Sequence, residues 1–214
     1  MPIKVAVLGS TGLVGRVLVD QLADCEGVCH VTAITRRATS WSSPKVQVKV
    51  IDFDEMAENA DVFDVDAVFL CLGTTLSQAG SIAAQRRVDV DYQYEAAQLA
   101  HERGVPHVLL VSSSGANARS LSPYLAMKGE LEERLEALNF QHLTILQPSL
   151  LLGERDRPRF AEGIGAAVLP WVCRLPVLTR FRPIEGEVVA RRLLQEALAP
   201  RSGVTRLRLD EVFL

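Results

Sequence analysis

The chain has 214 residues, of which 48% are hydrophobic and 23% charged, and its formal net charge is -3 at pH 7. Such a length accommodates one α/β domain with a small appended lobe, and the composition is that of an ordinary globular protein. The Lys and Arg residues are scattered along a mildly acidic chain, so a nucleic-acid-binding surface is not expected.

The first four residues lead directly into an apolar run, without the charged and apolar regions of a secretory signal. We therefore expect a cytoplasmic protein. The four cysteines and four histidines are dispersed, and they form neither a CxxC pair nor the ligand spacing of a metal site. The cysteines are accordingly predicted to be free thiols, and no metal is expected.

Apolar runs of strand length alternate with longer helical segments through most of the chain. Fully apolar runs are typical of buried parallel strands that helices cover on both faces. This alternation predicts an α/β fold with a doubly wound parallel sheet, the Rossmann fold. The expected strands cover residues 3–8, 31–34, 46–51, 67–72, 108–111, 143–146 and 205–209, and the expected helices cover residues 13–23, 82–103, 124–138 and 185–197.

The first strand–helix connection carries three glycines with the spacing GxxGxxG. Gly9 would permit a tight turn, Gly12 would let the backbone approach a pyrophosphate, and Gly15 would let helix and strand pack closely. The free N–H groups at the start of the following helix favour an anion. Glycines also occur in plain turns, but the position in the first strand–helix unit predicts a dinucleotide site. Its residues are Gly9, Ser10, Thr11, Gly12, Leu13, Val14 and Gly15.

The second predicted strand is followed by Arg36 and Arg37, with no acidic residue beside them. Sites that prefer NAD usually place a carboxylate near this point for the ribose hydroxyls. Two guanidinium groups suit a 2′-phosphate instead, through charge-assisted and often bidentate hydrogen bonds. We therefore predict NADP as the cofactor. The alternative interpretation is a solvated arginine pair on a loop.

Two further strand ends carry residues suited to the same cofactor. Asp52 and Phe53 follow the third strand, where a carboxylate could meet the adenine amino group and a ring could flank the base. After the fourth strand, Gly73 would allow the backbone to approach the cofactor. The residues assigned to this second contact are Leu72, Gly73, Thr74 and Thr75.

Hydroxyl groups follow the fifth strand, and a tyrosine and a lysine lie near the start of the next helix. Ser112, Ser113 and Ser114 stand at the strand end where ligands bind to open α/β sheets. Tyr124 and Lys128 are four residues apart, so they share one helix face, and leucines that belong in the core continue that face. Both side chains are therefore predicted to point inward, where burial is costly unless they have partners.

The pairing of Tyr124 with Lys128 predicts acid–base chemistry. An ammonium beside a phenol favours the phenolate and lowers its pKa, which would make Tyr124 a usable general acid near neutral pH. The alternative is an exposed tyrosine and an exposed lysine, since YxxxK occurs by chance in many helices. The glycine segment and the strand-end serines, at suitable spacing, favour the catalytic interpretation.

The sequence changes in character after Pro148, where prolines and glycines surround an apolar stretch at residues 164–178. That stretch is too short and too broken to span a membrane, and Arg174 lies inside it. We expect residues 1–214 to form a single NAD(P)-binding domain with a minimal substrate lobe around residues 151–186. The alternatives for the apolar stretch are a hydrophobic lid, a homodimer surface and a membrane-surface patch.

The order of GxxGxxG, strand-end serines and YxxxK resembles the short-chain dehydrogenase/reductase superfamily. The details are most similar to its atypical, extended-type branch, and within that to the human Tat-interacting protein family and its bacterial relatives. Gln147 stands where many relatives have arginine before the proline, which leaves the role of this side chain open. The segments that carry the resemblance are Gly9–Gly15, Cys71–Thr75, Val88–Tyr92, Ser112–Ala116, Tyr124–Gly129 and Gln147–Arg155.

This resemblance implies NADP(H) binding, with Tyr124 as general acid/base and Lys128 holding the nicotinamide ribose. It also implies a serine that donates a hydrogen bond to the substrate carbonyl. Strand position favours Ser113 for this role, with Ser114 as the alternative. Pro148 is also assigned to the cofactor site.

We therefore expect an NADP-dependent oxidoreductase that transfers hydride to or from a small carbonyl or alcohol. The alternative is an NADP(H)-binding regulatory or sensor protein without turnover, which a very small substrate lobe would suit. The expected partner is an unknown small-molecule substrate. Neither nucleic acid nor a membrane is expected, and a homodimer is a possible assembly.

Overall fold

The computed structural model describes residues 1–149, 151–152, 184–208 and 211–212. Their main feature is a seven-stranded parallel sheet in the order β3-β2-β1-β4-β5-β6-β9. The connections change direction between β1 and β4, which is where open α/β sheets bind ligands. The strands are β1 (Ile3–Leu8), β2 (Val28–Thr35), β3 (Val46–Val50), β4 (Ala67–Leu70), β5 (His107–Val111), β6 (His142–Gln147) and β9 (Gly203–Arg208).

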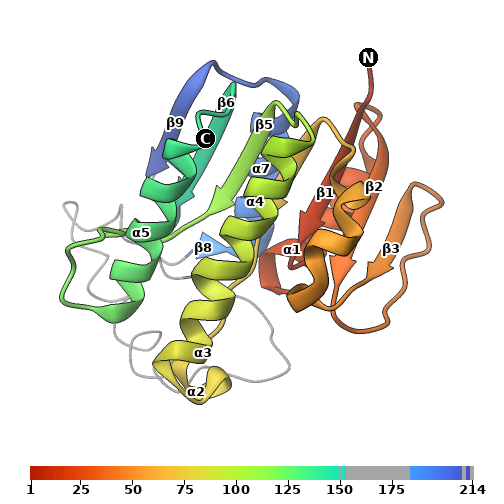
Figure 1. Ribbon diagram of the computed structural model, residues 1–214. Coiled ribbons are helices and arrows are strands. Elements are labelled where there is room, and N and C mark those ends of the chain that lie inside the picture. The colour runs from red at the N-terminus through yellow and green to blue at the C-terminus, as the bar shows by residue number, and fades with distance from the viewer. Residues whose placement is uncertain (150, 153–183, 209–210, 213–214) are drawn as a thin grey trace.

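Helices cover both faces of this sheet. On one face, α1 (Leu13–Asp24) packs against α7 (Gly186–Leu198). On the other face, α4 (Tyr92–Glu102) and α5 (Pro123–Ala137) cover the sheet together with η1 (Phe53–Phe63), a segment of 3-10 helix. Figure 1 shows α4 and α5 in front of the sheet and α7 behind it. The apolar core therefore forms two layers, one on each side of the sheet.

The strands and helices expected from the sequence are present, with ends that differ by a few residues. β9 forms one edge of the sheet, as expected from its alternating sequence, and the half-exposed β3 forms the other. Hydrophobic periodicity does not anticipate the 11-residue η1 or the short helix α2 (Leu76–Ala79). Both begin with a capping side chain, Asp52 for η1 and Thr75 for α2. Capping is a local signal that periodicity does not detect.

The expected helix over residues 82–103 is observed, but it contains one irregular turn. It runs as α3 (Ile82–Arg86), a π-helical turn η2 (Arg87–Asp91) and then α4. The chain leaves the helix through Gly104, which has φ +77°. A π turn holds more residues than an α turn, so it changes which side chains face the sheet. Here Asp89 lies in the interior and is 0% exposed.

The substrate lobe expected around residues 151–186 falls mainly on residues 153–183, which lie outside the described part of the chain. The apolar stretch at 164–178 lies there too. The two ends of the lobe are described, and β7 (Leu151–Leu152) pairs in parallel with β8 (Ile184–Glu185) as a separate small sheet. Among the described helices, none combines the length and the apolar character needed to cross a membrane.

A buried histidine lies at the start of β5. His107 is 2% exposed, and its Nε2 lies 2.9 Å from the Thr144 hydroxyl on β6. Its Nδ1 has no hydrogen-bond partner among the described residues. Burial, and to a lesser extent the neighbouring His142, lowers the pKa of His107 to about 4. The folded protein therefore holds a neutral imidazole in its core at neutral pH.

We expect the free energy of unfolding to fall as the pH decreases from about 6.5 to about 4. In this window the unfolded chain binds a proton at His107 that the folded chain does not bind, so acid favours unfolding. The shift in pKa corresponds to about 3 kcal/mol of the free energy of unfolding. This stability is fully present at neutral pH and is lost as the pH falls to about 4 and below. Denaturant unfolding at a series of pH values measures it.

His107→Gln should remove this part of the pH dependence, because the amide does not titrate. The matched control is His101→Gln, which changes an exposed histidine and should keep the wild-type profile. If the wild type and His107→Gln lose stability equally on acidification, His107 is not the group responsible.

Candidate active site

The glycine segment forms a tight turn between β1 and α1 at the carboxyl edge of the sheet. Gly9 has φ +87°, and a Cβ on it would lie 2.8 Å from the backbone of Cys71. A Cβ on Gly15 would lie 2.2 Å from the Gly9 carbonyl oxygen. The buried Ser10 hydroxyl donates a hydrogen bond of 3.0 Å to the Ile34 carbonyl oxygen, which ties the turn to β2. The tight turn and the close packing expected at Gly9 and Gly15 are both observed.

The start of α1 is open to an anion. Gly12 is its N-cap, no side chain caps it, and its first turn holds no acidic residue. Thr11 and Gly12 are exposed, whereas Leu13 is half-buried and Val14 is buried, so these two offer their backbone rather than their side chains. The free N–H groups and the positive end of the helix dipole bind phosphate groups well. The pyrophosphate of a dinucleotide therefore fits this turn.

The loop after β2 carries the two arginines expected at the cofactor site. The Thr35 hydroxyl accepts a hydrogen bond of 3.2 Å from the Arg37 N–H and orders the start of the loop. The exposed Arg36 guanidinium lies over the Phe53 ring, 5.6 Å from its centroid, while Phe53 itself is 2% exposed. Asp52 is exposed and caps η1. An adenine ring at this edge would thus meet Arg36 before it met Phe53.

A buried carboxylate holds the loop after β4. The Thr74 N–H donates a hydrogen bond of 3.1 Å to Asp89 Oδ2. Leu72 packs on the core, and Thr75 caps α2. Gly73 is exposed, and a Cβ on it would lie 3.8 Å from Asp89, an ordinary van der Waals distance. Packing within the chain therefore does not require glycine at this position, so the open side of Gly73 is available to a ligand.

Lys128 and Asp89 form a buried ion pair between α5 and the π turn. Lys128 Nζ lies 2.9 Å from Asp89 Oδ1, and the two side chains are 3% and 0% exposed. Lys128 Nζ also lies 5.9 Å from the centroid of the half-buried Tyr124 ring. The structure therefore brings Tyr124 and Lys128 together, and Asp89 is the partner that a buried lysine needs. Because the negative charge of Asp89 lies beside the ammonium, the electric field of Lys128 at the Tyr124 phenol is weaker than that of an isolated charge.

The three serines after β5 have different environments. Ser112 is buried, and its hydroxyl donates a short hydrogen bond to Glu132 on α5. Ser113 and Ser114 are half-buried. The Ser113 hydroxyl makes a long contact of 3.5 Å with the Ser114 carbonyl oxygen, and the Ser114 N–H donates to the buried Pro148 carbonyl oxygen at 2.8 Å. The Ser112 hydroxyl is thus occupied by its hydrogen bond to Glu132 in the core. Ser113, with Ser114 as the alternative, stays the predicted contact for a substrate.

Gln147 helps to satisfy the same buried carboxylate. Its amide nitrogen donates to both oxygens of Glu132, at 3.0 and 2.9 Å. Its amide oxygen accepts a hydrogen bond of 3.1 Å from Arg208 Nε, and Arg206 Nε lies 3.9 Å from Glu132. The arginines of β9 therefore supply the positive charge that an arginine at position 147 would bring. Gln147 has a structural role beneath the candidate site.

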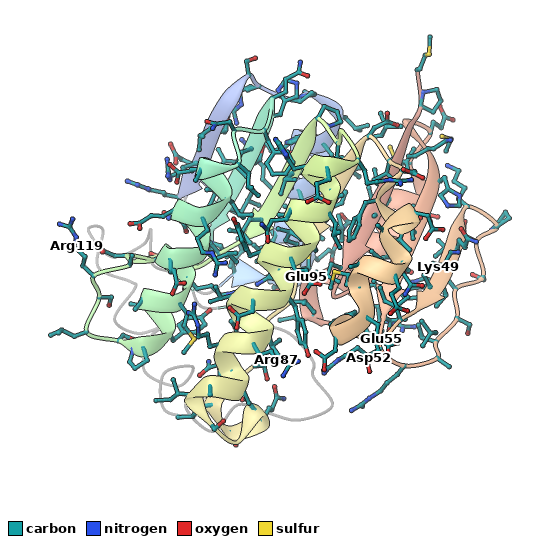
Figure 2. All side chains as sticks on the ribbon, viewed as in Figure 1. Lys49, Asp52, Glu55, Arg87, Glu95 and Arg119 are labelled. Atoms are coloured by element: carbon teal, nitrogen blue, oxygen red, sulfur yellow. The ribbon has the colours of Figure 1, made fainter. Side chains whose placement is uncertain are left out.

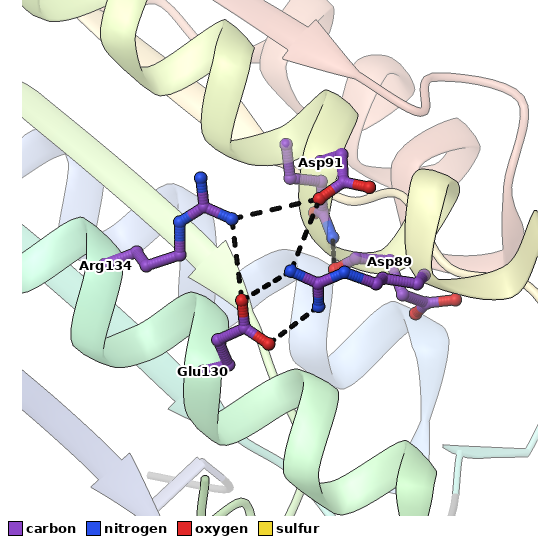
Figure 3. Close-up of polar contacts among 6 residues, drawn as sticks. Asp89, Asp91, Glu130 and Arg134 are labelled. Carbon is purple, nitrogen blue, oxygen red and sulfur yellow. Dashed lines mark hydrogen bonds and ion pairs between the residues drawn. The ribbon is translucent and has the colours of Figure 1, made fainter. Parts of the chain in front are cut away.

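A second set of ion pairs joins α5 to the helix α3–α4 on the outer side. Arg86 donates two hydrogen bonds to Glu130, at 2.7 and 2.6 Å. Arg134 lies 3.6 Å from Glu130 and 3.8 Å from Asp91. Figure 3 shows this cluster, with Asp89 lying apart from the Glu130 carboxylate. These side chains are about one-third exposed or more, so each pair contributes little stability, but together they fix the two helices side by side.

Three residues that shape the site have no role predicted from the sequence, namely Asp89, Gly129 and Glu132, although the first two lie in segments that carry the family resemblance. A Cβ on Gly129 would lie 2.2 Å from the backbone at Asn117, so the loop after the serines packs directly on α5 beside Lys128. Glu132 follows Lys128 by four residues and therefore shares its inward face. That spacing is a signal that could have identified Glu132 as a buried polar residue.

The candidate site combines a phosphate-binding turn, a half-buried phenol and a charge-balanced ammonium at one edge of the sheet. Burial raises the pKa of the Cys71 thiol to about 12, so Cys71 stays neutral in this environment. Within the described part of the chain, no group of three or more His, Cys, Asp and Glu side chains could hold a metal ion. The donors that are present fit a nicotinamide dinucleotide, whose phosphates would lie at the start of α1.

Known proteins of related sequence identify the cofactor class. Residues 9–164 match the protein family described as NAD(P)H-binding. Protein HTATIP2 of Rattus norvegicus is 33% identical over an alignment 222 residues long, which covers 99% of this chain and 88% of that protein. Protein FMP52-1, mitochondrial, of Scheffersomyces stipitis is 37% identical over 191 residues, which cover 86% of this chain and 84% of that protein.

The fungal relatives correct one expectation. Several of them are named as mitochondrial proteins, which contradicts the predicted cytoplasmic location. That prediction rested on the lack of a secretory pattern, and such a lack carries no information about import into other compartments. The prediction of a purely cytoplasmic protein is therefore wrong.

Solved structures with low sequence identity share the fold. MoeE5 in complex with UDP-glucose and NAD has a TM-score of 0.71 at 19% identity, covering 98% of this chain and 79% of that chain. UDP-N-acetylglucosamine 4-epimerase from Methanobrevibacter ruminantium M1 has a TM-score of 0.73 at 17% identity, covering 99% and 80%. These similarities confirm the predicted Rossmann fold. With the family match and the relationship to HTATIP2, they show that the chain belongs to the NAD(P)H-binding family, as an atypical short-chain dehydrogenase/reductase.

Proposed function

We propose that the protein is an NADP-dependent oxidoreductase that transfers hydride to or from a small carbonyl or alcohol. The observation that carries this proposal is the position of Lys128 Nζ, 5.9 Å from the centroid of the Tyr124 ring and at the same sheet edge as the dinucleotide-binding turn. The family match and the fold support an NAD(P)H-binding Rossmann protein, and the oxidoreductase activity is part of our proposal. The cofactor preference and the reaction are what we add.

In carbonyl reduction, a bound nicotinamide would supply hydride to the carbonyl carbon. The Tyr124 hydroxyl would give its proton to the carbonyl oxygen and become a phenolate, which must regain a proton before the next turnover. Ser113, or Ser114, would donate a hydrogen bond to the same oxygen. Lys128 would donate to the nicotinamide ribose, and Asp89 would keep the ammonium charged and oriented in its buried position.

Arg36 and Arg37 support NADP over NAD. Both side chains are exposed at the end of β2, and neither forms an ion pair with a carboxylate of the described residues. Two guanidinium groups that form no ion pair favour a 2′-phosphate, whereas the ribose hydroxyls of NAD would call for a carboxylate. The substrate is proposed to be small because the lobe available to enclose it is short.

The cofactor site predicts different results for two glycines of the same turn. Gly12→Val should abolish NADPH binding and leave the fold largely intact, because Gly12 is exposed, its new Cβ would need only a small shift of the Gly9 carbonyl oxygen 3.3 Å away, and its side chain would occupy the space of the pyrophosphate. Gly15→Ala should lower stability as well as binding, because its Cβ would lie 2.2 Å from the Gly9 carbonyl oxygen. Calorimetric titration and thermal unfolding measure the two effects. Wild-type NADPH affinity in a folded Gly12→Val protein would remove the basis of the site.

Tyr124→Phe tests whether the site performs chemistry. The substitution keeps the ring and its packing but deletes the proton donor, so turnover of a carbonyl substrate should fall by roughly 10²–10⁴-fold with cofactor affinity nearly unchanged. Tyr94→Phe is the matched control, since the Tyr94 ring packs under the Arg134 guanidinium, 3.8 Å from the ring centroid. A Tyr124→Phe protein with undiminished turnover would refute the proposed role. Without any turnover in the wild type, the sensor interpretation would replace the enzyme.

Asp89→Asn should destabilise the protein by about 3–5 kcal/mol, the usual cost of leaving a buried charge without its partner. The matched control is Asp91→Asn, two residues away, whose side chain is 46% exposed and whose loss should cost less than about 1 kcal/mol. Replacing both members of the pair, as Asp89→Asn with Lys128→Met, should recover much of the stability. Denaturant unfolding measures all four proteins. Equal small losses for Asp89→Asn and Asp91→Asn would contradict the importance of the buried pair.

A further inference from the structure

Most arginines in the described part of the chain pair with carboxylates, but three near the candidate cofactor site do not. Arg16, Arg36 and Arg37 are exposed and form no ion pair with any described residue. Arg16 lies on α1, and the other two lie on the loop after β2. By contrast, ion pairs are formed by Arg86, Arg87, Arg103, Arg134, Arg191, Arg192, Arg201 and Arg206.

An aromatic ring, rather than a carboxylate, holds Arg16. Its guanidinium carbon lies 5.5 Å from the centroid of Trp41, on the loop after β2. Trp41 is half-buried and packs against the core layer that includes residues of α1. Its indole N–H is buried without an acceptor among the described residues, so packing rather than a hydrogen bond fixes the ring. Trp41 therefore positions Arg16 beside the loop that carries Arg36 and Arg37.

The location of Arg16 is unfavourable for a cation unless an anion lies nearby. Arg16 is the fourth residue of α1, close to the positive end of the helix dipole, and the first turn holds no acidic residue. The turn after β1 and the loop after β2 lie side by side, because Leu8 and Ile34 are register partners and the Ser10 hydroxyl is bonded to the Ile34 carbonyl oxygen. A phosphate between these segments would face both the helix start and Arg16.

We propose that Arg16, positioned by Trp41, is a third contact for the 2′-phosphate and helps to determine the preference for NADP over NAD. The stack restricts the rotamers of a long side chain, so less conformational entropy remains to be lost when the phosphate binds. Arg36 makes the same kind of cation–π contact, with its guanidinium over the Phe53 ring. This inference rests on the proposed preference for NADP and adds residues that the glycine and arginine motifs do not indicate.

Calorimetric titration of the full chain with NADP⁺ and with NAD⁺ tests the inference. Arg16→Gln should weaken NADP⁺ binding by roughly 10-fold or more, the usual effect of losing one charge-assisted hydrogen bond, and leave NAD⁺ binding unchanged. Trp41→Ala should weaken NADP⁺ binding selectively by roughly 2–5-fold, and Trp41→Phe should restore most of this loss because a ring remains. The control is Arg119→Gln, which should change neither affinity. Figure 2 shows Arg119 on the opposite side of the molecule from Lys49 on β3.

The possible outcomes distinguish a failure of the role of Arg16 from a failure of the proposed preference for NADP. A wild type that binds NADP⁺ and NAD⁺ equally would overturn the preference for NADP and the role of Arg16 together. A wild type that prefers NADP⁺, with the same preference in Arg16→Gln, would overturn the role of Arg16 alone. Equal losses for both cofactors in Arg16→Gln would also overturn it, because they would indicate a general structural effect. Arg16 is exposed, so this variant should fold even if Trp41→Ala does not.

Discussion

A buried ion pair between Asp89 and Lys128 organises the carboxyl edge of the sheet. Taking two charges out of water costs free energy, and such a pair is tolerated when its geometry is good and its remaining atoms are hydrogen-bonded. Asp89 meets part of this condition: Oδ2 accepts a hydrogen bond from the Thr74 N–H, whereas Oδ1 lies 2.9 Å from Lys128 Nζ as an ion pair and accepts no hydrogen bond from the described residues. One carboxylate therefore fixes the lysine of α5 and the loop after β4 relative to each other, on the two sides of the candidate site.

The position of Asp89 depends in turn on the π turn and on the contact between two helices. The π turn at η2 changes the phase of the helix and directs Asp89 inward, while Asp91 remains partly exposed and faces Arg134. On the outer side, Glu130 bonds to Arg86 and keeps α5 beside this helix. The exposed ion pairs thus help to preserve the geometry of the buried pair.

The sequence was sufficient for the fold and for the two motifs of the site, because each depends on local spacing. Apolar runs identified the buried strands, and the four-residue spacing of Tyr124 and Lys128 placed them on one inward face. Asp89 was missed because its orientation depends on an irregular helical turn that regular periodicity does not reveal. The separate role of Ser112 was missed for a different reason: its partner, Glu132, is twenty residues away in the chain, and such pairings appear only once α5 is packed on the sheet.

Charge is distributed unevenly along the edge where the cofactor is proposed to bind. At the end with Tyr124, the charge of Lys128 is balanced by Asp89, and Glu132 accepts hydrogen bonds from Gln147 and lies 3.9 Å from Arg206 of β9. At the other end, Arg16 on α1 and Arg36 and Arg37 after β2 form no ion pair with a described carboxylate, although the pKa of the Asp54 carboxyl is lowered by the Tyr92 hydroxyl and, to a lesser extent, by the charge of Arg36. In NADP the 2′-phosphate lies at the adenosine end, the pyrophosphate in the middle and the nicotinamide at the other end, so this field favours a single orientation of the proposed cofactor. The balanced lysine bears on the proposed contact with the nicotinamide ribose, because an isolated ammonium would repel the cationic, oxidised nicotinamide, whereas an ion pair of zero net charge would not.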